Sequence, residues 1–582
     1  MKINVLKAGL FASVLMCNLP HVVYADEQPS PLDCATTVFA QPGVRFMHKI
    51  RAASPQAIVS VNGLPKGLTW NAARSLVEGV PQKAGRYTYQ IRVTENGKSA
   101  NEKVTFDVSD QLQHPIPFMG WLSWNAVESE VSEKIVKHVA DLFTETNLTN
   151  YGWNAVMMDD WWHAKSRAAD GSPQPDPVRF PNGLTPVSDY VHAKGMRFGI
   201  YTDAAEYTCA GAFGSYGKEN IDAEAYARWK VDVVKCDYCN APSERDTAFV
   251  RYRAMADALE KAGYGTMLYI CEWGEREPWK WGAEAGGRCW RISQDVRDCW
   301  TGRGNGEGVL QSIRDMKNIS AYQGVNRFND ADMLCTGLHG TGKSSNALCG
   351  GKGPGMTQDE YRTQFALWCM WSSPMALSFD PRKELQSDDE AILKSGEVIA
   401  LNQDAMGQQA DLISEADSLV VFAKDCENGD VALSVTNLSE KTKTASLNFA
   451  QIPALDMNKT YVVRDLWAEQ QLNDARNALT AEVRSHATRV FRLAEKTSNV
   501  RIVSPLSASG FAINAVPGKI IVNMPETKNL SKRILVTDLS GHIQKAMTTG
   551  KESVCLKMPA GDYMVSVACA AQVVRDKVVV KK

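Results

Sequence analysis

Acidic side chains stand where apolar, β-type runs end in the middle of this 582-residue chain. Between residues 114 and 405, five of the six runs that can be placed well end in a carboxylate, and Trp or Tyr residues lie beside several of them. One Asp after a strand is often a turn residue or a helix cap. Five such acids on one rim are better explained by a binding site. The acids are Asp159 with Asp160, Asp203, Asp237, Glu272, and Asp330 with Asp332, and Asp295 follows the remaining run.

This set of side chains suits a sugar. Carboxylates accept hydrogen bonds from hydroxyl groups, and aromatic rings cover the C–H faces of a pyranose. Two carboxyl groups that flank a glycosidic bond are also the groups that most glycoside hydrolases use to cleave it. The pattern therefore predicts a sugar site in which two of the acids do the chemistry.

Other classes of site fit the sequence less well. His is scarce, at 9 residues, and His163 is the one His expected near the rim, which disfavours Zn or Fe; a Ca or Mg site stays open as the alternative. No Gly-x-Ser-x-Gly motif follows a strand run, which disfavours a serine hydrolase. Lys and Arg number 64 against 66 Asp and Glu, so a nucleic-acid partner is not expected. We expect no cofactor and no metal.

The elements that must position these acids alternate along the chain. Eight apolar runs, separated by amphipathic stretches, extend over residues 114–405, which predicts a (β/α)8 barrel with its site at the C-terminal ends of the strands. A doubly wound open sheet is the alternative, but the glycine patterns of phosphate and dinucleotide loops are absent. The predicted strands are 117–124, 155–159, 197–202, 231–236, 266–271, 289–293, 327–333 and 374–379, and the predicted helices include 131–144, 185–194, 223–230, 247–261, 308–319 and 358–370.

All-β segments flank the predicted barrel. Residues 26–113 contain short alternating runs with the turns Asn62-Gly63 and Asn96-Gly97, which predict a small sandwich. Within this segment, residues 63–70 and 80–89 resemble bacterial immunoglobulin-like domains. Residues 406–496 predict an antiparallel β-sandwich, and residues 497–582 predict a further β-rich module. The chain is therefore expected to be multidomain, with a barrel between all-β domains.

The N-terminus and the cysteines predict export. Residues 1–25 have the basic start, short apolar run and small residues of a signal peptide, and no later run is apolar for long enough to span a membrane. In an oxidising compartment several of the 14 Cys should pair. From their closeness in the chain we expect Cys209 to pair with Cys239, and Cys335 with Cys349.

The ordered motifs of the barrel resemble glycoside hydrolase family 27, the family of α-galactosidases (melibiases) and α-N-acetylgalactosaminidases. The resemblance extends over residues 114–496. It rests on residues 119–125 (MGWLSWN), 158–162 (MDDWW), 198–203 (FGIYTD), 207–211 (YTCAG), 234–239 (VKCDYC), 271–274 (CEWG), Trp290-Arg291 with Asp295, and 329–333 (NDADM).

The resemblance implies a retaining mechanism with Asp237 as the nucleophile and Asp295 as the acid/base. Such a pair is expected about 5–5.5 Å apart. Lys235 shares a strand face with Asp237 and should help to keep it ionised, whereas Asp295 needs a raised pKa to begin as an acid. The resemblance also implies the Cys209–Cys239 disulfide and a set of sugar-binding residues: Trp121, Asp159, Asp160, Tyr201, Lys235, Glu272, Trp273, Arg291 and Asp332.

The substrate implied is a galactose-containing oligo- or polysaccharide with a terminal α-linked galactose. Asp at both 159 and 160 favours galactose, because a longer Glu would crowd its hydroxymethyl arm. A β-L-arabinopyranosidase and an α-N-acetylgalactosaminidase are alternatives within the family, and a non-catalytic carbohydrate-binding protein is a distant one. Trp161 and Ala331 depart from the Cys and Pro that are usual in the family, but neither change removes a charge.

The last module bears on location. Its sequence at residues 536–541 and 556–567, with a Val- and Lys-rich end, resembles the C-terminal sorting domain of type IX secretion in Bacteroidota. An ordinary accessory β domain is the alternative. We expect the protein in the periplasm, at the cell surface or outside a Gram-negative bacterium, and the sequence leaves its oligomeric state open.

Overall fold

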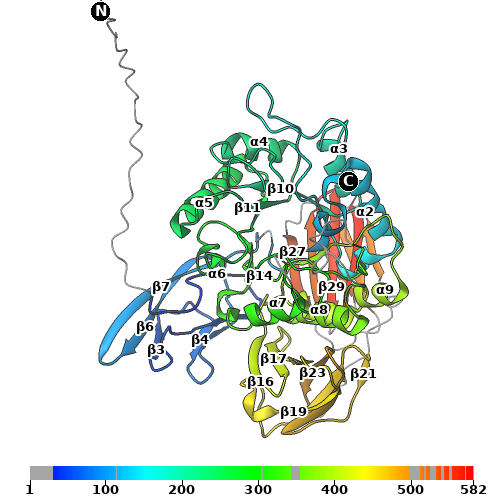
Figure 1. Cartoon of the computed structure of the whole chain (residues 1–582). Coiled ribbons are helices and arrows are strands. Elements are labelled where there is room, and N and C mark those ends of the chain that lie inside the picture. The colour runs from blue at the N-terminus through cyan, green and yellow to red at the C-terminus, as the bar shows by residue number, and fades with distance from the viewer. Residues whose placement is uncertain are drawn as a thin grey trace, which may run out of the picture.

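Eight short parallel strands form the centre of the molecule (Figure 1). The computed structural model describes residues 30–496, apart from 113, 303–305 and 342–353, and separate segments between 512 and 580. The strands are β8 (Met119–Leu122), β9 (Ala155–Met157), β10 (Arg197–Asp203), β11 (Val233–Asp237), β12 (Met267–Ile270), β13 (Cys289–Arg291), β14 (Phe328–Asp330) and β15 (Met375–Leu377). Because both faces are buried, strands such as β8, β9, β12 and β15 are apolar at successive positions rather than alternating.

The sheet closes on itself. Its order is β14-β13-β12-β11-β10-β9-β8-β15. Beyond β14, Leu334 makes a parallel bridge to Leu377 of β15, and the Leu334 amide donates to the Ala376 carbonyl at 2.8 Å. The (β/α)8 barrel expected from the sequence is confirmed, and all eight predicted strands are present.

Helices cover the outside of the barrel, and each of the six predicted stretches overlaps one. Helix α2 (Glu133–Glu145) buries Ile135, Val136, Val139, Ala140 and Phe143, which lie on one face at helical spacing. The others are α1 (Trp124–Val127), α3 (Thr185–Ala193), α4 (Glu219–Arg228), α5 (Arg245–Ala262), α6 (Pro278–Trp281), α7 (Val309–Met316), α8 (Gln358–Trp371), α9 (Ser387–Leu393) and α10 (Gly396–Asn402).

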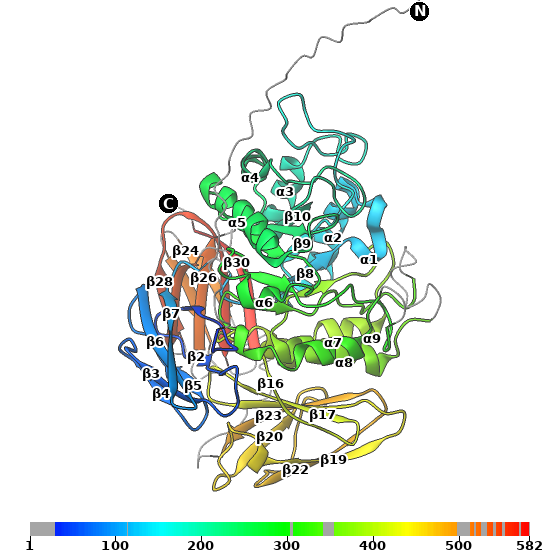
Figure 2. The same cartoon turned by 60° about the vertical axis from the view of Figure 1, so that its left-hand side comes forward.

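The N-terminal β domain packs beside the barrel (Figure 2). Its sheets have the orders β1-β7-β6-β3 and β2-β5-β4, and Phe46, Tyr89 and Phe106 pack between them. The predicted turn at Asn96-Gly97 has φ of 49° and 76° and joins β6 to β7. The strands are β1 (Thr37–Ala40), β2 (Phe46–Lys49), β3 (Ile58–Asn62), β4 (Leu68–Asn71), β5 (Leu76–Gly79), β6 (Gly85–Glu95) and β7 (Lys98–Val108).

A second β-sandwich follows the barrel and packs against α8. Its sheets have the orders β16-β17-β18-β23-β20-β21 and β19-β22, around a core that includes Leu433 and Phe491. A buried ion pair between Arg464 and Glu397 of α10 joins it to the barrel. The strands are β16 (Asp411–Ala416), β17 (Leu419–Asp425), β18 (Val431–Asn437), β19 (Lys443–Asn448), β20 (Tyr461–Asp465), β21 (Gln470–Gln471), β22 (Ala478–Val483) and β23 (Thr488–Glu495).

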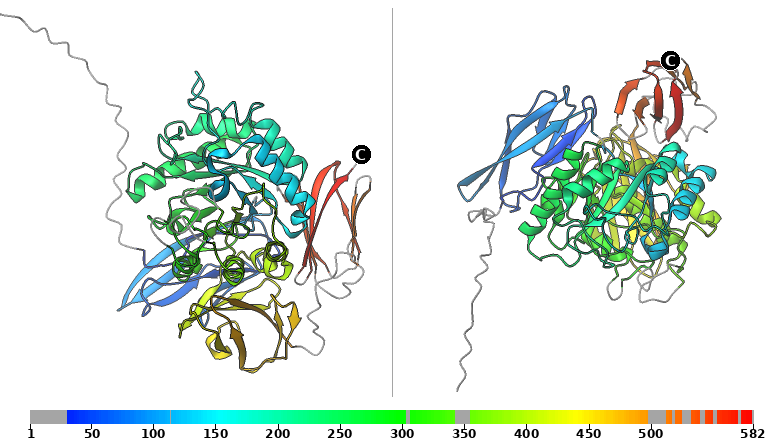
Figure 3. Two further views of the ribbon diagram at one scale, coloured as in Figure 1. Left: turned by 45° about the vertical axis from the view of Figure 1, so that its right-hand side comes forward. Right: turned by 90° about the horizontal axis from the view of Figure 1, so that it is seen from above.

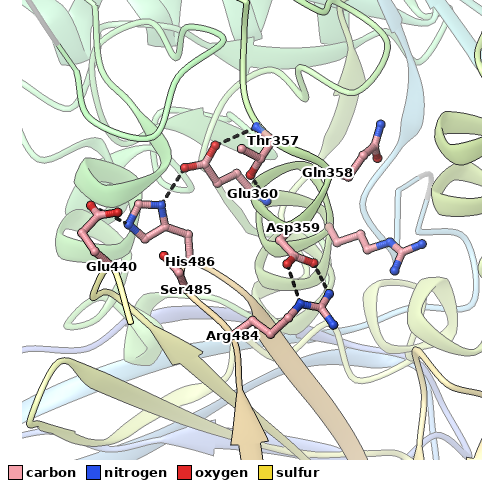
Figure 4. A pocket seen from close by; sticks show the side chains of 9 residues that line it. Thr357, Gln358, Asp359, Glu360, Glu440, Arg484, Ser485 and His486 are labelled. Atoms are coloured by element: carbon pink, nitrogen blue, oxygen red, sulfur yellow. Dashed lines mark hydrogen bonds and ion pairs between the residues drawn. The ribbon is translucent and has the colours of Figure 1, made fainter. Parts of the chain in front are cut away.

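A pocket of about 590 Å³ lies at the seam between this sandwich and the start of α8 (Figure 4). Polar side chains of the two domains meet across it: Arg484 forms an ion pair with Asp359, and His486 contacts Glu360 at 2.7 Å. None of its lining residues belongs to the predicted sugar site. These contacts across the seam pocket therefore hold the two domains together.

The last module is also a two-sheet β structure, seen beside the barrel in Figure 3. Its sheets have the orders β24-β25-β28 and β27-β26-β29-β30, and β30 contacts α10. The strands are β24 (Ala512–Val516), β25 (Lys519–Asn523), β26 (Lys532–Asp538), β27 (Ile543–Thr549), β28 (Ser553–Lys557), β29 (Gly561–Cys569) and β30 (Gln572–Val580). The predicted signal peptide lies outside the described residues. No helix in the described part of the chain is long and apolar enough to cross a membrane.

Candidate active site

Neighbouring strands β10 and β11 bring four site residues together. In their register Tyr201 pairs with Lys235, and Asp203 pairs with Asp237. Alternate residues of a strand point to the same side of a sheet. The Lys235 ammonium accordingly lies over the Tyr201 ring, 5.5 Å from its centre, and the Tyr201 hydroxyl donates to Oδ2 of Asp237 at 2.8 Å.

The two carboxylate oxygens of Asp237 differ in their surroundings. Oδ2 accepts the Tyr201 hydroxyl and lies 3.3 Å from the Cys209 sulfur. Oδ1 is buried and accepts no hydrogen bond from a nitrogen or oxygen donor in the part of the chain that the structure describes. Burial raises the pKa of Asp237 to about 6, against the opposing effect of the Lys235 charge. Oδ2 is thus held by an O–H donor, whereas Oδ1 has no N–H or O–H donor among the described residues.

Lys235 makes its direct ion pair with Asp159. The Lys235 Nζ and Asp159 Oδ2 atoms are 2.7 Å apart, and both side chains are almost fully buried. Burial alone would favour the neutral lysine, but Asp159 and other nearby acids raise the pKa of Lys235 well above its usual value. The lysine therefore stays charged, and its field lowers the pKa of Asp237 as the sequence led us to expect.

Asp295 is held by two arginines. Its Oδ1 lies 3.1 Å from Nη2 of Arg291, and its Oδ2 lies 3.2 Å from Nη2 of Arg297. Arg291 also pairs with Asp332 at 2.9 Å. Burial acts to raise the pKa of Asp295, but the charges of Arg291 and Arg297 outweigh it and hold the pKa at about 2. Our expectation of a raised pKa for this acid is wrong for the free site.

Asp160 ties two rim loops together. Its Oδ1 accepts the Trp161 amide at 2.7 Å, and its Oδ2 accepts the Ala210 amide at 2.9 Å. The second loop is closed by the Cys209–Cys239 disulfide, which confirms that predicted pair. His163, whose Nδ1 lies 3.5 Å from Oδ1, and the hydrogen bond from Ala210 outweigh burial and lower the pKa of Asp160, so this acid is ionised and fixed.

Three predicted residues make their direct contacts with neighbouring loops. The Trp121 ring is fully buried, and its indole N–H donates to the Phe379 carbonyl at 2.9 Å. Glu272 pairs with Arg276 at 2.9 Å within the loop after β12. Trp273 lies next to it with left-handed backbone, at φ 57°. The sugar-binding roles of these three residues stay predictions.

The second predicted disulfide is wrong. Cys335 is a free, fully buried thiol whose nearest polar neighbours are the Met333 carbonyl and Gln364. Cys299 is disulfide-bonded instead, and Cys349 lies outside the described residues. Closeness in the chain did not predict the pairing, because Cys335 follows β14 into the barrel core.

Two neighbours of the predicted catalytic pair were given no role from the sequence. One is Asp203, named there only among the rim acids, which ends β10 and has a carboxylate oxygen within 4.8 Å of one of Asp237. It accepts the amides of Ala205 and Cys239. Its position at a strand end was a usable signal. The other is Arg297, for which no motif gave a signal.

A metal is not required to explain the acidic cluster. Among the described residues, Asp203, Cys209, Asp237 and Cys239 form a group with ligand-like spacing. Its two sulfurs are joined in the disulfide, so they are not thiolate ligands. The rim therefore presents two carboxyls, the buried Asp237 of β11 and the partly exposed Asp295 that follows β13, among the predicted sugar-binding residues.

Comparisons with known proteins give relatives for three parts of the chain. The model of the α-galactosidase A family matches residues 116–404, that of the α-galactosidase C-terminal β-sandwich matches 416–493, and an Ig-domain model matches 33–109. α-Galactosidase A of Cellvibrio japonicus is 35% identical over 329 residues, which cover 56% of this chain and 76% of that protein.

Solved structures give the same relationship. A melibiase-type protein of Bacteroides fragilis aligns over 80% of this chain and 97% of its own, with 32% identity and a TM-score of 0.63. α-Galactosidase I of Mortierella vinacea aligns over 66% of this chain and 98% of its own, with 28% identity and a TM-score of 0.60. The chain therefore belongs to the melibiase family, glycoside hydrolase family 27.

Proposed function

We propose that the protein is a retaining exo-α-galactosidase, which removes terminal α-linked galactose from oligo- or polysaccharides by double displacement. Family relatives named for this activity support the proposal, as do Asp237 at the end of β11 and Asp295 in the loop after β13, near enough for the charge of Asp295 to raise the pKa of Asp237. The observation that carries it is the asymmetry of Asp237: Oδ2 is held by Tyr201 and Oδ1 is left to attack carbon.

In the first step Oδ1 of Asp237 attacks the anomeric carbon from the face opposite the leaving group. The bond from that carbon to the leaving oxygen breaks, and Asp295 gives its proton to that oxygen. A covalent glycosyl-enzyme results. The hydroxyl of Tyr201 steadies the carboxylate as its charge passes into the ester.

In the second step Asp295 acts as the base, and Asp237 is the group that leaves. Asp295, now ionised, takes a proton from water, and the water oxygen attacks the anomeric carbon and displaces Asp237. Two inversions give net retention. The charge of Arg291 on Asp295 favours this base form.

The hydroxyl-binding groups lie around this pair. We assign Asp159, Asp160 and Lys235 to the galactose hydroxyls, and Arg291 with Asp332 to the side of Asp295. Trp121, Glu272 and Trp273 complete the proposed sugar-binding set. Asp at both 159 and 160 favours galactose over sugars without the hydroxymethyl arm.

Hydrolysis of nitrophenyl α-galactoside tests the proposal, run beside the β-L-arabinopyranoside and the α-N-acetylgalactosaminide. We expect the α-galactoside to be the best substrate, with retained configuration in the first product. Asp237→Asn should lower kcat by at least about a thousandfold, since its residual turnover rests on binding alone. Asp170→Asn, at an exposed loop acid, is the matched control and should keep full activity. Substantial turnover by Asp237→Asn would refute the assignment of the nucleophile.

We also propose that the protein is exported. The composition of residues 1–25 and the disulfide between Cys209 and Cys239 support this, because such pairs persist in oxidising compartments. The sorting-domain resemblance of the last module supports delivery to the cell surface or beyond. Cell fractionation with antibody against the barrel tests both ideas, and a cytoplasmic pool alone would contradict them.

A further inference from the structure

Arg297 stands beside the acid/base residue without a role in the scheme above. It binds Oδ2 of Asp295, whereas Arg291 of the sugar-binding set binds Oδ1. The two guanidinium groups therefore grip different oxygens of one carboxylate. Asp295 is the more exposed partner, at 23% of its side chain, against 5% for Arg297.

Arg297 is fixed in this place by its own surroundings. Its amide donates to the Glu307 carbonyl at 2.8 Å, and the Glu307 amide donates back to the Asp295 carbonyl at 2.9 Å. Its Nη1 donates to Oδ1 of Asn125, which follows β8, at 3.3 Å. A Cβ at Gly306 would lie 2.3 Å from Arg297 Cγ, so only glycine lets the chain pass here. The side chain is preorganised against Asp295.

The charges around Asp295 come from several elements. Lys235 and Asp237 face it from β11, Arg291 from β13, and Asp332 from the loop after β14. Lys235 is already paired with Asp159, and Arg291 is paired with Asp332. Within the described residues, Arg297 has no ion-pair partner other than Asp295. Among the described residues, the Arg297 charge is therefore paired with Asp295 alone.

We propose that Arg297 is a positioning residue that holds Asp295 ionised, which favours its action as a base in the second step over its action as an acid in the first. This inference rests on the proposed function of Asp295. The low pKa of Asp295 agrees with it.

The test separates the two steps by the leaving group. Cleavage of a dinitrophenyl galactoside needs no proton from Asp295, whereas cleavage of melibiose does. The ratio of kcat/KM for melibiose to kcat/KM for the dinitrophenyl galactoside therefore reports the protonated fraction of Asp295. In Arg297→Met this ratio should rise about tenfold or more at neutral pH, since a lost neighbouring charge moves a carboxyl pKa by about one to three units.

Arg297→Met should slow the second step, although it favours proton donation in the first. With the dinitrophenyl galactoside, kcat of Arg297→Met should fall at acid pH, because Asp295 is then protonated and no longer activates water. Arg297→Lys keeps the charge and should leave both quantities within about threefold of the wild type. Damage to the fold alone would lower both steps together, so a gain in the first with a loss in the second is specific to the proposal.

An Arg297→Met enzyme with the wild-type ratio at every pH would overturn the inference. Equal changes of this ratio in Arg297→Met and Arg297→Lys would also overturn it. If Arg297→Met does not fold, Asn125→Ala loosens the same guanidinium and should move the ratio in the same direction, and an unchanged ratio there would also overturn it. Wild-type hydrolysis of nitrophenyl α-galactoside tests the proposed function separately, so the two failures are distinguishable.

Discussion

The phenol of Tyr201 on β10 donates to Oδ2 of Asp237 on β11 at 2.8 Å, so one strand holds the proposed nucleophile of its neighbour. The sequence resemblance implied a sugar contact for this tyrosine. The contact that the structure provides is to the enzyme's own carboxylate. A hydrogen bond to an ionised carboxylate favours the charged form and lowers its pKa. By this rule the Tyr201 hydrogen bond acts in the same direction as the Lys235 charge, which opposes the burial that raises the pKa of Asp237.

Replacing Tyr201 by Phe should shift the pH dependence of the reaction. With a dinitrophenyl galactoside, kcat/KM requires only ionised Asp237 and should rise with pH through about 6 in the wild type. Without the phenol the carboxylate is less well stabilised, so the rise should move to higher pH. The loss below that pH should be about tenfold or more, the worth of a hydrogen bond to a charged group. If kcat/KM of Tyr201→Phe rose over the same pH range as that of the wild type, Tyr201 would not act on the proposed nucleophile.

Replacing Lys235 by Met should destabilise the barrel. Asp159 would be left buried without its partner, which costs about 3–5 kcal/mol for a broken buried ion pair. The loss should shrink at acid pH, where the lone carboxyl is protonated. Urea unfolding followed by circular dichroism measures the effect. Adding Asp159→Asn should restore most of the stability, and a double variant no more stable than Lys235→Met would contradict the pairing.

The position of the site was predictable because strand ends are local features. Tyr201, Lys235 and Asp237 each end an apolar run, and the parallel barrel brings all such ends to one rim. The ion pair between Asp295 and Arg297, two residues apart in the loop after β13, illustrates what was not predictable. Arg297 meets the acid because residue 296 bridges to Glu307 far along the loop. No periodicity in the sequence encodes that bridge.

Cysteine pairing was likewise predictable only in part, because it depends on the tertiary fold as well as on the local sequence. Cys209 and Cys239 belong to loops after adjacent strands β10 and β11, so the barrel itself brings them together, with Cα atoms 5.1 Å apart. Cys335 follows β14, but there the chain turns inward and buries the thiol. Closeness along the chain predicted the first pair correctly and the second pair incorrectly.

Asp203 should make stability fall as pH rises. Burial, helped by the charge of Asp237, raises its pKa to about 9 in the folded protein, against about 3.9 in an unfolded chain. Between those values the folded state binds a proton that the unfolded state releases, so this residue lowers the free energy of unfolding as pH increases. Asp203→Asn cannot titrate. The stability of the variant relative to the wild type should therefore increase with pH, by up to about 1.4 kcal/mol per unit.

Paired urea titrations of the two proteins at acid and neutral pH measure that difference. The Asn amide also faces the backbone amides of Ala205 and Cys239, which costs some stability at every pH and so does not alter the trend. A constant difference between variant and wild type would mean that Asp203 stays ionised beside Asp237.

The Cys209–Cys239 disulfide should contribute both to stability and to the site. It closes a loop with a sequence separation of 30, which corresponds to about 3–4 kcal/mol in the chain-entropy view. The same loop donates the Ala210 amide to Asp160 and places the Cys209 sulfur beside Oδ2 of Asp237. The double variant Cys209→Ser/Cys239→Ser should therefore lose stability toward urea and also bind galactose more weakly. Dithiothreitol should produce the same two losses in the wild type and none in the double variant. If the reductant lowered the stability of both proteins equally, another disulfide, such as the one that Cys299 forms, would carry the effect instead.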